Sequence, residues 1–295
     1  HTRYISVTGV QTCALPILSS DYFMVEQHIE GFNVSDLNWG TSSAKTVTLS
    51  FQVYSSLTGA FGGALQNYAS TRSYPFSYTI STANTWQYQS ISIAGDTTGQ
   101  WFTNNSTGMY LSFSLGNGSN YTRTSGVWTT DNTHGANGEV QVINNANGSF
   151  YLTGVQLEKG AQATSFDWRH YTTELQLCQR YFQKSYNLDI AVGTATSTGN
   201  SGYVEWNWGA MASYGTVPIF TKVTLRASPT FTTYRIGDGT INGYAYWNGS
   251  TTVQASGIIG SYGLGTNLIT WYMDGTSRSN MQFHWTASAE LGVQN

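Results

Sequence analysis

The chain has 295 residues, a net charge of −3 at pH 7 and only 9% charged residues, against about 25% in an average soluble domain. Aromatic residues make up 15% of the chain; disordered segments are poor in aromatic residues and rich in charge, so a disordered protein is excluded. No cluster of Lys and Arg supplies the basic surface that nucleic acids require, and we expect no nucleic-acid partner. No apolar run approaches the roughly 20 residues of a membrane span, so no membrane insertion is expected.

Residues 1–18 share neither the composition nor the pattern of the rest of the chain. The run from Val7 to Ile17 looks like an in-frame translation of a sequencing-library adapter. A secretion signal is the alternative, but the apolar core is short, is interrupted by Pro16 and lacks a basic flank. We expect this segment to be an artefact or disordered and to add nothing to the fold. A strand lost with the native N-terminus would leave one sheet edge open.

From residue 21 onward, alternating apolar and polar residues predict antiparallel strands. In the segment 46–54, four apolar residues would share one face: Val47, Leu49, Phe51 and Val53. Clusters of Gly, Asn and Asp between such runs, as at 59–63, are interpreted as turns. The strands expected here are 22–30, 46–54, 76–80, 86–93, 109–115 and 150–157. Six such strands predict a sandwich, and their order resembles that of jelly-roll carbohydrate-binding modules.

One convincing helix is predicted over residues 171–185. Leu175, Cys178 and Phe182 fall at spacings of three and four, which places them on one helical face at a structural junction. Cys178 is expected to be a small hydrophobe on the inner side of this helix. The other cysteine, Cys13, lies in the suspect segment, so neither a disulfide framework nor a cysteine metal site is expected.

A second β-rich region follows the helix. Its expected strands are 203–208, 219–225, 230–234, 243–247, 269–273 and 281–286. The predicted fold is all-β, with two antiparallel, jelly-roll-like β-sandwich domains joined by one short α-helix. The expected divisions are 1–18, the first sandwich at 19–162, a linker and helix at 163–187, and the second sandwich at 188–295.

The junction between the two regions carries a family resemblance. The runs VQLEKG (155–160), ATSFDWR (163–169) and ELQLCQRYF (174–182) resemble a junction of tail-fibre-like and other virion surface proteins of tailed bacteriophages. Ser165 replaces a proline of that pattern, Asp167 a glutamate and Phe182 a tyrosine. The similarity covers roughly residues 21 to 291. It implies a virion component that forms a homotrimer, with the helix near the trimer axis, and it implies no catalytic residues.

Few residues suggest a catalytic or metal-binding site. Glu26, His28 and Glu30 would share one face of a strand, either as a metal or acid–base cluster or as a polar outer face; the second interpretation is favoured. The sequence contains no Gly-x-Ser-x-Gly, His-Glu-x-x-His or phosphate-loop motif. A glycosidase needs two carboxylates at a defined separation, and the carboxylates here are scattered. We expect no enzyme, no cofactor and no metal.

Aromatic residues are the better indication of function. An exposed ring beside amides suits a glycan, because sugar C–H faces stack on rings while amides bind hydroxyls; the same rings can also fill cores or subunit interfaces. Candidates in the first half are Trp39, Trp86, Trp101 and Trp128. In the second half, Asn242–Gly249 is the densest aromatic–amide stretch, and we predict that Trp247, or the pair Tyr244 and Tyr246, stacks on a glycan beside Asn248.

Together these features suggest a tail-fibre-like subunit on the virion surface. The expected partners are a host cell-surface glycan, bound for attachment, and other virion proteins. A secreted pair of carbohydrate-binding modules is the second hypothesis, and a glycan-degrading tailspike-type enzyme is the third.

Overall fold

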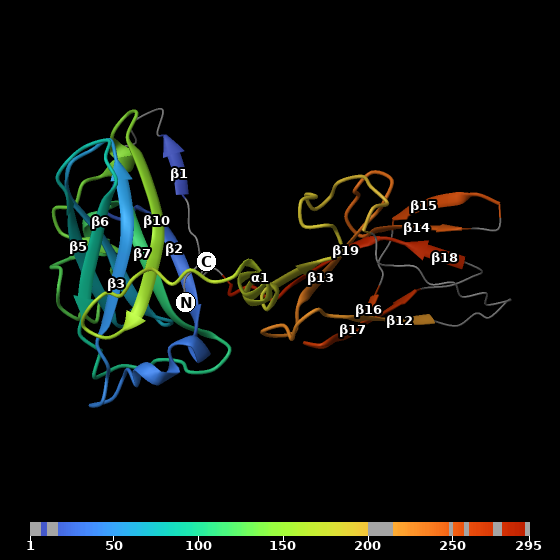
Figure 1. Cartoon of the computed structure of the whole chain (residues 1–295), viewed down its shortest axis with the longest axis horizontal. Helices are drawn as coiled ribbons and strands as arrows, with labels where there is room; N and C mark the ends of the chain where they lie inside the picture. Colours follow the sequence, from blue (N-terminus) through green and yellow to red (C-terminus); the bar gives the residue numbers. More distant parts are fainter. Residues whose placement is uncertain are drawn as a thin grey trace. The chain divides into compact units, whose positions relative to one another are not determined.

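A computed structural model describes residues 7–10, 17–199, 215–247, 250–256, 260–273 and 279–292. The chain divides into two compact units, residues 1–168 and 169–295 (Figure 1). Antiparallel strands dominate both units, and the described residues contain a single α-helix, which confirms the predicted all-β class. No helix in the described ranges is long and apolar enough to span a membrane.

Unit 1 contains two four-stranded sheets. Sheet A has the strand order β1-β10-β3-β6 and sheet B the order β2-β7-β4-β5. The strands are β1 (Val7–Val10), β2 (Tyr22–Glu30), β3 (Val47–Ser55), β4 (Gly59–Asn67), β5 (Ser73–Ile80), β6 (Gln87–Ile93), β7 (Thr107–Asn117), β8 (Thr122–Arg123), β9 (Gly135–Ala136) and β10 (Ser149–Lys159). Short 3-10 turns occur at η1 (Gly31–Asn33), η2 (Ser35–Leu37), η3 (Ser119–Tyr121) and η4 (Val142–Asn144). All six strands predicted for this region are present.

The core of unit 1 lies between the two sheets. The predicted apolar face of β3 is buried, because Val47, Leu49, Phe51 and Val53 are all at most 1% exposed. Phe51 meets Phe113 of β7 edge to face, with 5.0 Å between ring centroids. The two sheets therefore share one apolar core, as expected for a sandwich.

Strand β4 is absent from the sequence prediction because its glycines resemble a turn. It is a central strand of sheet B, paired with β5 and β7. A Cβ on Gly63 would come within 2.4 Å of the Phe76 ring, and one on Gly62 within 2.2 Å of the Glu139 carboxylate. These glycines allow neighbouring groups to approach the backbone closely, which is the role glycine commonly has inside a strand.

Part of the N-terminal segment pairs with sheet A. Strand β1 runs antiparallel to β10, with Val7 opposite Leu152 and Val10 opposite Ser149. The expectation that residues 1–18 add nothing to the fold is therefore wrong for these four residues. An extended backbone can pair with any open sheet edge through its N–H and C=O groups, so this pairing requires no particular sequence.

The helix is shorter than predicted. Helix α1 covers Tyr171–Gln179, and Phe182 begins strand β11 (Phe182–Lys184), which pairs with β19. Within the helix no residue is buried; Leu175 is partly exposed and Cys178 exposed. The shared helical face of Leu175, Cys178 and Phe182 is therefore a wrong prediction. The segment becomes a strand because β19 offers a pairing edge, which outweighs the helical spacing.

The described strands of unit 2 form three small antiparallel sheets. Their orders are β11-β19-β13, β12-β17-β16 and β15-β14-β18. The remaining strands are β12 (Gly215–Phe220), β13 (Thr230–Tyr234), β14 (Gly243–Trp247), β15 (Thr252–Ser256), β16 (Gly260–Leu264), β17 (Leu268–Met273), β18 (Ser279–Gln282) and β19 (His284–Ser288). Because β11 pairs with β19, part of the predicted linker belongs to this unit. The predicted strand 203–208 lies outside the described residues.

A small core stabilises unit 2. Phe283 and Trp285 are buried in it with Leu225 and Ile269. On the opposite side of β19, His284 is also buried, and its ring stacks on Tyr186 at 3.7 Å between centroids. The predicted strand 281–286 is divided in the structure: β18 ends at Gln282 and β19 begins at His284, with Phe283 between them.

Candidate functional site

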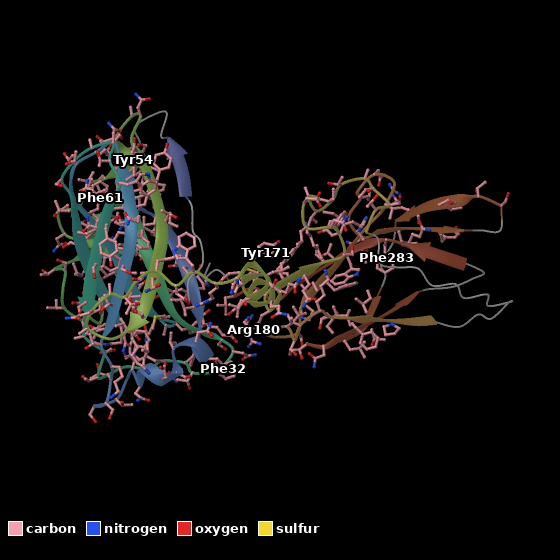
Figure 2. The ribbon with its side chains drawn as sticks, viewed as in Figure 1. Phe32, Tyr54, Phe61, Tyr171, Arg180 and Phe283 are labelled. Carbon is pink, nitrogen blue, oxygen red and sulfur yellow. The ribbon has the colours of Figure 1, made fainter. Side chains whose placement is uncertain are left out.

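A row of aromatic rings crosses the outer face of sheet A. Tyr54 of β3, labelled in Figure 2, lies opposite Tyr151 of β10, and their ring centroids are 5.2 Å apart. On its other side the ring of Trp86, the residue before β6, lies 5.7 Å from Tyr54. Alternation places these rings on the outer face because Val53 and Phe51 of β3 point into the core.

The rings at the β6 side are open to solvent. Trp86 is 49% exposed and Tyr88 55% exposed, while Tyr54 and Tyr151 are partly buried. Tyr88 lies opposite Gln52 in the register of β6 and β3. We call this surface the aromatic face, and it consists of Gln52, Tyr54, Asn84, Trp86, Tyr88 and Tyr151. Contiguous exposed apolar surface of this kind marks binding sites more often than scattered single residues do.

Hydrogen-bonding groups remain available across the aromatic face. Among the described residues, the Trp86 indole N–H, the hydroxyls of Tyr88 and Tyr151 and the Gln52 amide have no partner. The Tyr54 hydroxyl donates to Asn84 Oδ1 at 3.3 Å, which leaves the Asn84 amide nitrogen for another acceptor. A ligand rich in hydroxyls can therefore replace the water that hydrates these groups.

Four other glutamines of unit 1 use their side-chain amides within the fold. Gln66 bonds Ser73 and Asn132, Gln87 bonds Ser81, Gln89 bonds the Thr79 carbonyl, and Gln156 accepts from the Asp167 N–H. These amides form hydrogen bonds within the protein, so they are less available to a ligand than the Gln52 amide. The contrast distinguishes Gln52 from these four glutamines.

A bulge in β10 limits the aromatic face at one end. The register of β10 and β3 shifts between Thr153 and Gln156, and Gly154 has a φ of +61°. A Cβ on Gly154 would meet the Phe166 ring at 3.8 Å and the Gln52 side chain at 3.9 Å. The segment around Phe166 is thus held beside the bulge and covers that end of the sheet.

The same segment fixes the carboxylate of Glu158 on this side of sheet A. Thr164 donates its N–H to Glu158 Oε1 at 2.8 Å and its hydroxyl to Oε2 at 2.7 Å. Burial raises the pKa of Glu158, but bonds from Thr164 and Gln156 outweigh it, so the pKa lies below the ordinary value. Alternation and register give these outward positions on β3, β6 and β10: Thr48, Ser50, Gln52, Tyr54, Tyr88, Ser90, Ser92, Tyr151, Thr153, Gln156 and Glu158. Glu158 is the one charged residue among them.

The other three candidate tryptophans of unit 1 are structural. Each donates its indole N–H within the protein: Trp39 to the Lys45 carbonyl at 2.7 Å, Trp101 to Asp96 at 3.1 Å and Trp128 to the Ala94 carbonyl at 2.9 Å. Their rings meet edge to face, with Trp39 4.7 Å from Trp101 and 5.4 Å from Trp128. Of the four tryptophans, Trp86 alone has a free indole N–H in the described structure.

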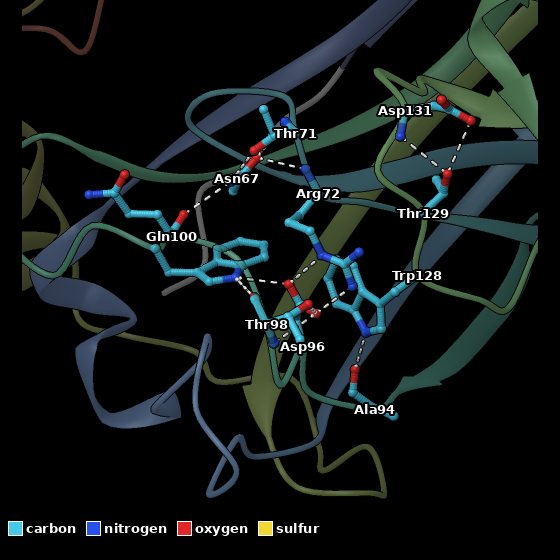
Figure 3. A network of polar contacts seen from close by, with 11 residues as sticks. Asn67, Thr71, Arg72, Ala94, Asp96, Thr98, Gln100, Trp128, Thr129 and Asp131 are labelled. Carbon is cyan, nitrogen blue, oxygen red and sulfur yellow. Dashed lines mark hydrogen bonds and ion pairs between the residues drawn. The ribbon is translucent and has the colours of Figure 1, made fainter.

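An ion pair supports this tryptophan cluster (Figure 3). Asp96 accepts from Arg72 Nε at 2.9 Å and from Arg72 Nη2 at 2.6 Å. The Arg72 guanidinium also lies over the Trp128 ring, 5.7 Å from its centroid. Because both carboxylate oxygens are occupied, the network holds loops together and offers no open group to a ligand.

The candidate acid–base cluster on β2 is incomplete. His28 Nε2 and Glu26 Oε1 are 2.8 Å apart, but the register of β2 and β7 shifts between Ile29 and Glu30, and Glu30 is buried. The bulge breaks the alternation on which the shared face depended. Within the described residues, no group of three or more His, Cys, Asp and Glu side chains could hold a metal ion.

The predicted tyrosine platform in unit 2 belongs to its core. Tyr244 is 7% exposed and is a member of the core cluster, and Tyr246 is partly buried against the same cluster. The two rings are 6.1 Å apart. Because Tyr244 is buried, its ring cannot offer its face to a glycan, so the predicted platform of both tyrosines is wrong. The side chain of Trp247 and all of Asn248 lie outside the described residues, and their role stays a prediction.

Of the six residues of the aromatic face, only Trp86 is among the candidates that the sequence suggests. The sequence does not suggest the other five, which are Gln52, Tyr54, Asn84, Tyr88 and Tyr151. The available signal is the outward phase of β3, where Gln52 and Tyr54 alternate with core residues. What a single sequence does not supply is the register that brings Tyr151 beside Tyr54, because the two residues are far apart in the chain.

Comparisons with known proteins add little. No family model and no curated protein matches the chain. The chain is similar to a solved structure titled "Crystal structure of PBSX exported protein XepA", with a TM-score of 0.22 and 9% identity over 95% of this chain and 86% of that chain. A TM-score this low carries no argument about fold or function. The resemblance to tail-fibre-like proteins therefore remains an inference from the junction sequence.

Proposed function

We propose that this chain is a non-enzymatic surface subunit of a phage virion that attaches the particle to its host by binding glycans. The aromatic face of unit 1 is the proposed binding surface. The observation that carries this proposal is the combination of exposed rings and unpartnered amide, hydroxyl and indole groups on one sheet face of the described structure. The virion assignment rests on the junction sequence at residues 155–182.

The physical basis is the complementarity between sugars and this surface. An aromatic ring has a negative face, which attracts the positive C–H groups of a sugar ring. The free groups of Gln52, Asn84 and Trp86 can bond the hydroxyls at the edges of that sugar. Such a shallow site binds weakly, on the order of millimolar, or about −4 kcal/mol. Several copies on one particle would raise the avidity by about 10²–10⁴-fold.

The test is adsorption of the purified full-length protein to host cells. We expect Trp86→Ala combined with Tyr151→Ala to reduce adsorption strongly. The matched control is Tyr68→Ala, which changes an exposed tyrosine in the turn directly after β4 of sheet B and should leave adsorption unchanged. Equal adsorption by the wild type and the folded double variant would contradict the assignment to the aromatic face.

Two further measurements separate the alternatives. Release of reducing ends from host polysaccharide would identify a glycan-degrading enzyme and contradict the non-enzymatic proposal. Full affinity in a stable monomer would favour the secreted binding-module hypothesis, because an attachment subunit is expected to be a homotrimer.

A further inference from the structure

We infer that the aromatic face binds an uncharged, linear, soluble glycan chain that lies across the strands from Trp86 over Tyr54 to Tyr151. This inference rests on the proposed function and specifies its ligand class. It follows from the charge of the face, the orientation of its rings and the order of the strands that carry them.

The charge of the face disfavours acidic sugars. Carboxylated, sulfated or phosphorylated glycans are normally bound by Arg or Lys, which form strong charge-assisted hydrogen bonds with them. The outward positions of β3, β6 and β10 contain no Arg or Lys, and their one charged residue is the acidic Glu158. An anionic chain would therefore lose hydration and find no counter-charge. Neutral hydroxyls or acetamido groups match the free amide and hydroxyl groups instead.

The rings are not coplanar. Tyr54 and Tyr151 are nearly perpendicular, with 83° between their planes, and Tyr54 and Trp86 are tilted by 51°. A flat crystalline polysaccharide would require parallel ring faces in one plane. A single soluble chain can rotate about its glycosidic bonds and present each sugar to a differently oriented ring.

The row of rings defines the direction of the chain. Trp86, Tyr54 and Tyr151 belong to three adjacent positions in sheet A, beside β6, on β3 and on β10. Neighbouring strands are about 4.8 Å apart, so the row extends across the sheet rather than along one strand. Gln52 lies one position away on the same face of β3, opposite Tyr88, where it can bond the middle of the chain. The segment around Phe166 closes the side beyond Gln52.

The experiment is a titration of the full-length protein with oligosaccharides of increasing length. The uncharged series are oligomers of β-1,4-glucose, α-1,4-glucose and β-1,4-N-acetylglucosamine, from monomer to hexamer. The charged series are oligomers of galacturonate and of sialic acid, and crystalline cellulose and chitin test flat surfaces. We expect one uncharged series to bind, with affinity that rises with length and then levels off.

The variants locate the chain on the face. Trp86→Ala and Tyr151→Ala should each weaken binding of the longest oligomer about tenfold, equivalent to about 1.4 kcal/mol. A shorter oligomer cannot contact both ends, so it should respond less to at least one of the two variants. Tyr68→Ala should bind like the wild type.

Several outcomes would overturn the inference. These are preference for a charged series, equal affinity for monomer and hexamer, retention on crystalline polysaccharide without binding of soluble oligomers, or no binding of any uncharged series. If host adsorption still depends on Trp86 in any of these cases, the proposed function stands and only the ligand class is wrong. If adsorption is also independent of Trp86, both fail.

Discussion

Asp96 connects three loops of unit 1 through its carboxylate and its backbone carbonyl. It is 1% exposed, and it accepts hydrogen bonds from Arg72, Trp101 and Thr98. Arg72 follows the turn after β4, and the backbone carbonyl of Asp96 accepts from the Gly40 N–H at 2.8 Å. A buried charge of this kind is tolerated only because its partners replace the lost water.

Removing the charge of Asp96 should destabilise the fold. We expect Asp96→Asn to lower the free energy of unfolding by about 3–5 kcal/mol, because it leaves Arg72 without its partner in a buried setting. The matched control is Asp131→Asn, since Asp131 pairs with Arg123 but is largely exposed, and water already screens an exposed pair. Urea denaturation measures both variants, and the control should lose far less. Equal losses in the two variants would show that burial of the Asp96 pair is not the cause.

The same pair should affect acid stability. Burial raises the pKa of Asp96, but hydrogen bonds from Arg72, Trp101 and Thr98 outweigh it and hold the pKa below the ordinary value. The contribution to stability is therefore fully present above the unfolded pKa of about 3.9, and it is lost as the pH falls through the folded pKa. Asp96→Asn should lose less stability than the wild type over that acid range.

A second pH effect should come from His134. Burial lowers the pKa of this histidine, with the charge of Glu26 opposing the shift, and its ring stacks on Tyr22 at 4.9 Å. The unfolded chain therefore binds a proton at this histidine more tightly than the folded chain does. The contribution of His134 to stability is fully present above the unfolded pKa of about 6.5 and is lost as the pH falls below it.

The variant His134→Phe keeps a ring against Tyr22 and removes the titrating group. We expect its melting temperature to fall less than that of the wild type between pH 7 and pH 5. Some acid sensitivity should remain, because burial also lowers the pKa of His284 in unit 2. An unchanged difference between wild type and variant across this range would contradict the assignment.

At the level of secondary structure, the local sequence pattern predicts most strands of unit 1. It fails where contacts with distant residues determine the conformation. Strand β3 is predictable because its apolar residues alternate without interruption, and the structure buries all of them. The glycines of β4 suggest a turn, because nothing local shows that Phe76 and Glu139 approach their backbone. Residues 178–182 fit helical spacing, yet Tyr181 and Gln183 are buried in the period of a strand. The aromatic face depends on register between distant strands, which a single sequence does not contain.

The position of Phe182 in a strand changes the loss of stability expected from its truncation. Phe182 begins β11 and is only partly buried, whereas Phe283 is fully buried in the core of unit 2. We expect Phe283→Ala to cost about 3–5 kcal/mol, and Phe182→Ala to cost clearly less because part of its ring is already in water. Denaturant unfolding of the two variants measures this. A loss from Phe182→Ala as large as that from Phe283→Ala would indicate burial by another chain.

The edge strand β1 gives a prediction for the N-terminal segment. Deleting residues 1–16 removes the four-residue ladder to β10 and exposes the backbone of Phe150 and Leu152. The net value of a backbone hydrogen bond is about 1 kcal/mol, so we expect a loss of roughly 1–2 kcal/mol and greater self-association. Light scattering and thermal unfolding test this. Stability unchanged within about 0.5 kcal/mol would show that the ladder contributes nothing.

Considered as a whole, the chain has two units with separate apolar cores. Helix α1 buries none of its residues within one chain, and Tyr171 and Leu177 on it are exposed. The homotrimer implied by the junction sequence stays a prediction, which sedimentation of the full-length protein tests. A stable monomer at micromolar concentration would contradict it.

Glycan binding by the aromatic face of unit 1 is the property on which the proposed attachment function depends. It can be measured by binding of the full-length protein to a glycan array, with the wild type, Trp86→Ala combined with Tyr151→Ala, and Tyr68→Ala at equal concentration. All three should first give matching circular dichroism and melting curves. We predict that the wild type and Tyr68→Ala bind the same uncharged glycans and that the double variant loses this signal. An unchanged signal from the folded double variant would contradict the proposal.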